Sequence, residues 1–211
     1  MELPQKRILM FEGADRAGKD THLPLVHDSL KENGLEPVIF EIPADLKKEL
    51  RTCSPLERLR EYLTHNIFMM QQIDFYLGEN QKNIALINRF YPSTLAGHNL
   101  NGIIRKHFNL TNGNNLEDLP YIQKQITPVL RPEALTILIT CNPEELKKRF
   151  SDIEPLHRYE SVDISIDHQE EFKRLNNKGV FGDTVLIDSS GSIKSTFNKI
   201  KSELTQYGFN L

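Results

Sequence analysis

The chain has 211 residues, of which 38% are apolar and 26% are charged, and its formal net charge is −3. This length suits one α/β domain with a full hydrophobic core, and the acidic balance argues against a duplex nucleic acid as partner. The sequence contains no signal peptide and no apolar stretch long enough to cross a bilayer, and its two isolated cysteines, Cys53 and Cys141, fit reduced thiols. We therefore expect a cytoplasmic protein with no membrane and no nucleic acid as partner.

Five short and nearly continuous apolar runs alternate with helical sequence. The strands are predicted at residues 7–11, 37–41, 84–87, 135–140 and 184–187. The helices are predicted at residues 19–31, 56–81, 92–107, 116–126, 143–150, 166–176 and 193–207. This alternation predicts a parallel sheet covered on both faces and built from βαβ units. Because no internal repeat or low-complexity linker interrupts it, we expect one domain over residues 1–211.

The segment between the first strand and the first helix has the spacing of a phosphate-binding loop, Gly-x4-Gly-Lys. Gly13 and Gly18 allow the backbone to wrap around an anion, so that N–H groups and the helix N-terminus point at phosphate oxygens. Lys19 places a positive charge where the β- and γ-phosphates would lie. The alternative is a chance match in a surface turn. Since strand, loop and helix occur in the required order, the sequence favours a site for a nucleoside triphosphate.

Asp20 is the unusual position of this loop. Ser or Thr commonly follows the lysine, and its hydroxyl coordinates magnesium. A carboxylate can also ligate magnesium, but it repels the phosphates when no metal is present. Thr21 offers a hydroxyl one place late. The loop is therefore either a variant that depends more heavily on its metal or a damaged one.

Three motifs in order along the chain resemble those of one kinase family. Residues 11–21 resemble the run Phe-Glu-Gly-x-Asp-x-x-Gly-Lys-Ser-Thr, residues 88–93 stand where the family has Asp-Arg-x-x-x-Ser, and residues 158–160 resemble the Arg-Tyr/Phe-Glu of its lid. The chain is thus similar to the thymidylate kinase family of nucleoside monophosphate kinases over nearly its whole length. The resemblance implies a P-loop NTPase fold, with a five-stranded parallel sheet of order 2-3-1-4-5 flanked by helices and a short lid at about residues 151–163. It also implies a homodimer.

The resemblance assigns roles on the donor side. Lys19, Arg16 and Arg89 would neutralise charge on the transferring phosphoryl group. Arg158 and Glu160 would belong to the lid that closes to exclude water. The residues expected to bind ATP are Gly13, Ala14, Asp15, Arg16, Ala17, Gly18, Lys19, Asp20 and Thr21, together with Arg149 beside the adenine.

On the acceptor side, Asp15 would contact a sugar hydroxyl and Phe68 would stack on the base, although Phe68 could instead be core. The full set expected at the acceptor is Asp15, Pro43, Phe68, Gln72, Arg89 and Ser93. Asp45 and Gln72 stand where the family has arginines. A charge-assisted hydrogen bond is worth roughly 1.5–3 kcal/mol, so a monophosphate would bind more weakly without these arginines. Lys47, Lys48 or Arg51 could take the place of the arginine that the family has where this chain has Asp45, through a shift of register.

The metal positions change as a pair. Asp20 replaces the loop hydroxyl, and Asn88 replaces the carboxylate that the family has after its third strand. The exchange keeps one carboxylate near the metal, with Asn88 in the second shell. We interpret the pair as compensation for a Mg²⁺ site, and simple decay is the alternative.

Together these features predict a thymidylate kinase-like enzyme that uses ATP and Mg²⁺. The expected acceptor is a (deoxy)nucleoside monophosphate, such as dTMP or a modified pyrimidine nucleotide. The alternatives are a kinase for a nucleoside and an inactive nucleotide-binding homologue. The apolar helix 56–81 could supply part of a dimer face or could be core throughout.

Overall fold

The computed structural model describes residues 4–211 except residues 112, 130, 132, 153–160 and 210. Five parallel strands form one sheet in the order β2-β3-β1-β4-β5, which confirms the predicted order. Their bounds are β1 (Ile8–Glu12), β2 (Glu36–Glu41), β3 (Asn83–Asn88), β4 (Ala134–Thr140) and β5 (Asp183–Asp188). Each of the five predicted strands is present within one residue of its expected bounds.

Helices connect the strands. Their bounds are α1 (Lys19–Glu32), α2 (Ala44–Leu50), α3 (Pro55–Glu79), α4 (Tyr91–Asn99), α5 (Gly102–His107), α6 (Pro120–Ile126), α7 (Pro143–Ser151), α8 (Val162–Asn177) and α9 (Ile193–Gln206), with 3₁₀ turns η1 (Leu116–Asp118) and η2 (Thr127–Val129). None of the helices in the described part of the chain combines the length and the hydropathy that a bilayer span requires.

Two predicted helices are broken, and one helix was not expected. The helix expected at 92–107 is two helices, because the Asn101 side chain accepts hydrogen bonds from the amides of Ile103 and Ile104 and so starts a new helix. The helix expected at 116–126 begins as a 3₁₀ turn and breaks at Leu119, which is extended because Pro120 follows it. Helix α2 was not predicted, since its polar sequence lacks an apolar periodicity.

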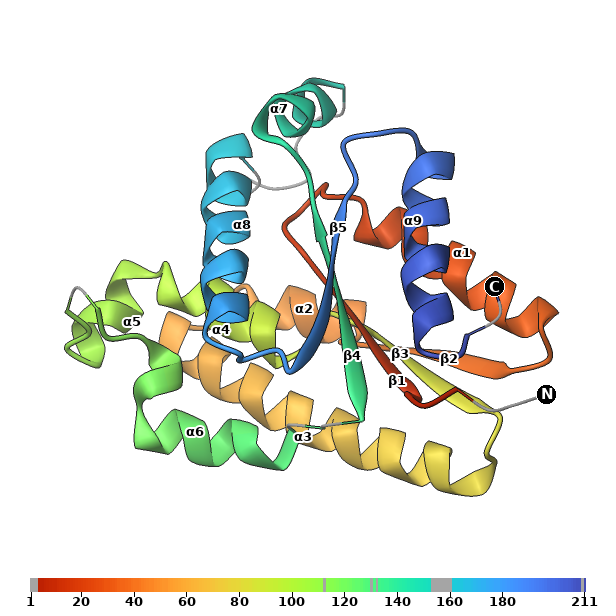
Figure 1. Cartoon of the computed structure of the whole chain (residues 1–211). Coiled ribbons are helices and arrows are strands. Elements are labelled where there is room, and N and C mark those ends of the chain that lie inside the picture. The colour runs from red at the N-terminus through yellow and green to blue at the C-terminus, as the bar shows by residue number, and fades with distance from the viewer. Residues whose placement is uncertain (1–3, 112, 130, 132, 153–160, 210) are drawn as a thin grey trace.

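The helices cover both faces of the sheet (Figure 1). Helices α1 and α9 lie on one face, and α3, α4 and α8 lie on the other. Strand β1 supplies both cores in alternation: Ile8 and Met10 face the α3 side, and Leu9 and Phe11 face the α1 side. All four side chains are at most 3% exposed. A strand buried on both faces must be apolar throughout, which explains the continuous apolar runs of the sequence.

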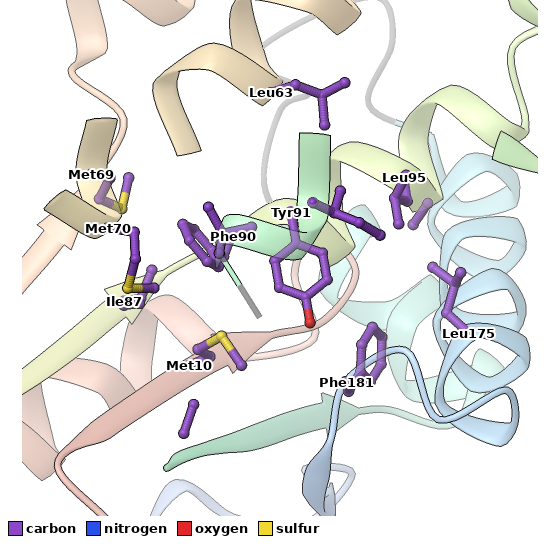
Figure 2. Packing of buried hydrophobic residues seen from close by; sticks show 14 of the residues in the cluster. Met10, Leu63, Met69, Met70, Ile87, Phe90, Tyr91, Leu95, Leu175 and Phe181 are labelled. Carbon is purple, nitrogen blue, oxygen red and sulfur yellow. The ribbon is translucent and has the colours of Figure 1, made fainter. Parts of the chain in front are cut away.

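Figure 2 shows the core on the α3 side, with Phe90 and Tyr91 at its centre. The two rings meet edge to face, with centroids 5.3 Å apart. The Tyr91 hydroxyl donates a hydrogen bond of 2.7 Å to the carbonyl oxygen of Val180. These two aromatic residues follow directly on Arg89, so their burial fixes the start of α4 at the end of β3.

A buried ionic cluster joins η1, α4 and α8. Glu117 lies 2.6 Å from the guanidinium of Arg174 and 3.0 Å from the ammonium of Lys178, and it accepts a hydrogen bond of 2.9 Å from Asn99. Burial by itself would raise the pKa of Glu117, but these donors outweigh burial and lower the pKa to about 2. The ionised carboxylate therefore stabilises the fold at neutral pH.

This cluster predicts part of the acid sensitivity of the protein. Because the folded state holds the pKa of Glu117 below its unfolded value, the stabilisation is present above about pH 4.5 and is lost as the pH falls towards 2. We expect Glu117→Gln to lower the free energy of unfolding by about 3 kcal/mol at pH 7 and by much less at pH 2, measured by urea unfolding. The control is Glu170→Gln, which removes an exposed pair with Lys173 and should change stability little at either pH. Equal losses at both pH values would contradict this role of Glu117.

Candidate functional site

The loop from Gly13 to Gly18 lies at the carboxyl end of β1 and leads into α1. Gly13 has φ 146°, and a Cβ atom at this position would overlap the backbone carbonyl oxygen of Ile139 in β4. Gly18 has φ 105°, and Arg16 also adopts a left-handed conformation with φ 60°. The chain therefore curls closely against β4, and glycine is required at residue 13 both by its φ and by the contact. This geometry confirms the strand, loop and helix order on which the predicted phosphate site rests.

The cations and anions of the loop are paired with one another. Lys19 is only 3% exposed, and its ammonium lies 2.7 Å from both carboxylate oxygens of Asp20. Burial, helped by the charge of Arg89, lowers the pKa of Lys19 to about 8. Burial would raise the pKa of Asp20, but Lys19 outweighs it and lowers that pKa below its ordinary value. Asp20 is thus ionised and supplies the negative charge that a phosphate would otherwise bring to Lys19.

Arg16 and Arg149 tie the loop to α7. Arg16 donates to the carbonyl oxygen of Arg149 at 3.1 Å, and its guanidinium lies 4.3 Å from the centre of the Phe150 ring. In return, Arg149 donates to the carbonyl oxygen of Arg16 at 3.1 Å and to that of Ser189 at 2.6 Å. The structure thus brings together the two arginines predicted at the donor site. The guanidinium of Arg149, however, is already bonded to the backbone of the loop at Arg16 and to the backbone after β5 at Ser189.

Ser189 was not predicted from the sequence. It follows β5 directly, is 1% exposed, and donates its hydroxyl to the carbonyl oxygen of Ala17 in the loop. Residues 17 and 189 are 172 positions apart, and a single serine in a turn gives no signal of such a contact. Of the other loop residues, Ala14 and Ala17 are buried, whereas Thr21 is exposed in the first turn of α1.

Arg89, predicted at the acceptor, lies beside the loop. It has φ 66°, its amide donates to the carbonyl oxygen of Phe11 at 3.1 Å, and its guanidinium pairs with Asp15. Ser93, one turn further along, lies 3.5 Å from the same guanidinium. The predicted residues Asp15, Arg89 and Ser93 are therefore adjacent in the fold.

Glu12 was also not predicted, although it precedes the first glycine of the loop. The carboxylate is completely buried and accepts hydrogen bonds from the amide of Phe90, at 2.7 Å, and from the hydroxyl of Ser93. A charged residue at the end of a wholly apolar strand was the available signal. Burial raises the pKa of Glu12 to about 7, even though these two donors and Arg89 act in the opposite direction.

The predicted metal pair, Asp20 and Asn88, is also brought together. The Asn88 amide donates to Asp20 at 3.3 Å and to Glu41, at the end of β2, at 3.2 Å. The Asn88 side-chain oxygen is buried and has no hydrogen-bond partner among the described residues. The two carboxylates are hard oxygen ligands of the kind that Mg²⁺ prefers, and Mg²⁺ commonly takes only one or two carboxylates beside substrate phosphates. The residues present therefore fit magnesium, and Glu41 is an addition that the sequence did not predict.

The remaining residues predicted at the acceptor are exposed. Phe68 is 54% exposed on α3, so the alternative that it is core is wrong. Gln72, one turn further along α3, is also exposed. Pro43 precedes α2 and is likewise exposed. The lid residues Arg158 and Glu160 lie outside the described residues, as does most of the predicted lid.

Arg58, in α3, is a further cation beside the end of α2. Arg58 donates to the carbonyl oxygens of Leu50 at 2.9 Å and Cys53 at 3.2 Å, so it holds the end of α2 against α3. Burial raises the pKa of the Tyr62 phenol, and the guanidinium groups of Arg58, Arg51 and Arg89 act in the opposite direction.

Gly13 allows a direct test of the loop geometry. We expect Gly13→Ala to abolish binding of ATP measured by calorimetry, because the new methyl group would displace the loop from β4. The matched control is Gly78→Ala in α3, where an added Cβ meets nothing within 4 Å. This control should keep the affinity for ATP and gain roughly 0.5–1 kcal/mol of stability. Normal ATP affinity in Gly13→Ala would refute the loop as the phosphate site.

Comparisons with known proteins agree with this geometry. A search of curated proteins finds no match. The structure of a thymidylate kinase from Candida albicans, described as revealing the origin of broad substrate specificity, superposes with a TM-score of 0.68. The two sequences are 18% identical, and the match covers 98% of this chain and 93% of that one, so it shows a shared fold. The model of the thymidylate kinase family matches residues 11–200. The chain is therefore a nucleotide kinase and belongs to the thymidylate kinase family.

Proposed function

We propose that this nucleotide kinase transfers the γ-phosphoryl group of ATP to a (deoxy)nucleoside monophosphate, such as dTMP or a modified pyrimidine nucleotide. The observation that carries the proposal is Arg89, a cation beside the loop that pairs with Asp15. Arg51 and Arg58 add positive charge that acts to lower the pKa of the Tyr62 phenol. A phosphorylated acceptor needs such charge, whereas a nucleoside does not.

Arg51 supports the idea that α2 supplies a cation in place of the family's arginine. It lies at the C-cap of α2, six residues after Asp45, which occupies the place of that arginine. Asp45 itself lies in the first turn of α2 and is exposed. Arg51 would therefore bind the acceptor phosphate from the opposite end of the helix.

The donor side follows from the pairs around the loop. The loop amides and the N-terminus of α1 would bind the phosphates, and Lys19 would exchange Asp20 for phosphate oxygens. Arg16 would leave the Phe150 ring to reach the transferring group, and Arg149 would flank the adenine. The lid residues Arg158 and Glu160 would then exclude water.

Magnesium is proposed at Asp20, with Asn88 not touching the ion but donating its amide to Asp20 and to the neighbouring Glu41. The ion would supply charge neutralisation at the β- and γ-oxygens of the donor. Asp20 would turn from Lys19 to the ion, which frees Lys19 for the phosphates. The exchange of Asp20 and Asn88 would thus be compensation and not decay. The homodimer and the cytoplasmic location stay predictions of the sequence.

A nucleoside is the second candidate acceptor. The negative charge of Asp45 and the uncharged Gln72 favour it, because both replace arginines of the family. The two acceptors differ in one phosphate, so a direct comparison separates them.

The acceptor is tested by incubating the protein with ATP, Mg²⁺ and each nucleoside or nucleoside monophosphate, and by measuring the phosphorylated product. We expect a pyrimidine monophosphate to be phosphorylated and Lys19→Ala to remove the activity. Arg51→Gln should raise the KM of the monophosphate about tenfold or more and leave the KM of ATP unchanged. Lys31→Gln, which removes an exposed cation at the far end of α1, is the control. Product from nucleosides alone, or from no acceptor, would overturn the proposal.

Compensation at the metal site is tested by exchanging the two residues. Asp20→Ser should lower turnover at saturating substrates and raise the Mg²⁺ concentration needed for half-maximal rate, because it removes the proposed ligand. Asn88→Asp in the same chain should recover both quantities, since it returns one carboxylate to the site. A fully active Asp20→Ser single variant would show that Asp20 does not hold the metal.

A further inference from the structure

Glu12 is a buried carboxylate that no step of the proposed reaction uses. It is the last residue of β1, it is 0% exposed, and its two oxygens accept hydrogen bonds from two different donors. One donor is the amide of Phe90, 78 positions away, and the other is the hydroxyl of Ser93, 81 positions away. The carboxylate therefore fastens the end of β1 to the start of α4.

The segment held by Glu12 carries Arg89. The two donors follow Arg89 in the chain, and Arg89 itself is in the left-handed region with φ 66°. A residue with a side chain keeps this conformation only when its surroundings fix it. Two anchors do so here: the Arg89 amide bonds the carbonyl oxygen of Phe11, and the next amide bonds Glu12. The conformation directs the Arg89 guanidinium to Asp15.

We propose that Glu12 is a positioning residue for the reaction: it holds the turn from which Arg89 reaches Asp15 and the acceptor. The inference rests on the proposed function, because it assigns Arg89 to the acceptor. Glu12 does not touch a substrate and acts through Arg89.

The charge of Glu12 weakens the fold at high pH. Burial raises its pKa to about 7, against an ordinary value of 4.5. Between these two values the folded state binds a proton that the unfolded state does not, so stability falls as the pH rises through this window. The groups that face the carboxylate are Lys19 from α1, Arg89 after β3, and Phe90, Tyr91 and Ser93 at the start of α4. A group that costs stability when it is ionised, yet holds a catalytic arginine, is expected where function selects it.

A glutamine at residue 12 mimics the protonated form of Glu12, so it separates the effects of the two protonation states of this side chain. A protonated carboxyl keeps one acceptor oxygen and turns the other into a donor, and the Gln side chain has the same arrangement. Glu12→Gln can therefore still accept from the Phe90 amide and donate to Ser93, which permits folding, but it lacks the negative charge that attracts the Arg89 guanidinium. It fixes the site in the form that the wild-type protein adopts below pH 7.

The test measures Glu12→Gln for stability, ATP binding and turnover of the accepted monophosphate between pH 5.5 and 8.5. These pH limits bracket a pKa of about 7. We expect the wild-type kcat/KM for the monophosphate to rise through pH 7 and the variant to lack this rise. At pH 8 the variant should have a higher Tm than the wild-type protein, an unchanged affinity for ATP, and a turnover roughly 10- to 100-fold lower. A residue with a merely structural role would lower Tm and leave the pH profile in place.

Two comparisons show whether Glu12 acts through Arg89. In an Arg89→Ala background, Glu12→Gln should cause almost no further loss of turnover. Glu171→Gln removes another buried carboxylate, whose hydrogen-bond partners are Asn99 and Arg174, and should lower Tm without changing the pH profile. Losses that multiply in the double variant, or a Glu12→Gln protein with both lower Tm and weaker ATP binding, would overturn the proposal.

An activity-independent measurement keeps the inference separate from the proposed function. If the wild-type protein phosphorylates no monophosphate, the proposed function fails, and the anchor is still tested by hydrogen exchange at the Phe90 amide. This amide should exchange roughly tenfold faster or more in Glu12→Ala than in the wild-type protein, because its acceptor is gone. Unchanged exchange would overturn the inference by itself.

Discussion

The close approach of the loop backbone to β4 is the constraint on which the site depends. Gly13 lies against the carbonyl oxygen of Ile139, where no side chain fits, and this contact fixes the point at which the loop leaves β1. The central position of β1 in the sheet places that point at the carboxyl end of the strands. Open α/β sheets bind ligands at this edge because the strand ends and helix N-termini converge there. Glu12, Lys19, Asn88 and Ser189 all stand at this edge.

Charge balance is the second theme of the site. Lys19 is paired with Asp20, Arg89 is paired with Asp15, and Arg16 and Arg149 bond to backbone carbonyl groups. Buried cations of this kind need partners, since an unpaired charge is costly inside a protein. A nucleotide and its metal would replace these partners with phosphate oxygens and with a cation. The departure of this chain from its family at Asp20 fits this view, because Asp20 and the nearby Glu41 add negative charge on the side where a metal would bind.

Much of the fold and the loop could be predicted from the sequence, and the reason is that these features are local. The alternation of apolar strands with helices sets the parallel sheet, and the glycine spacing sets the loop. The resemblance to one family then gave the strand order. Errors in the helices also had local causes: the Asn101 cap, the proline after Leu119, and the polar sequence of α2. The burial of Phe68 could not be predicted from its apolar neighbours in the sequence, since this aromatic residue is half exposed.

By itself, the sequence determined that a phosphate loop joins a buried strand to a helix, because adjacent residues carry that geometry. Only the tertiary structure decided which distant groups meet there. Glu12 bonds residues 78 and 81 positions away, and Ser189 reaches the loop from 172 positions away. Such partners depend on how the sheet and the helices pack together. The identity of a polar residue in the sequence does not show whether packing will supply it with a partner.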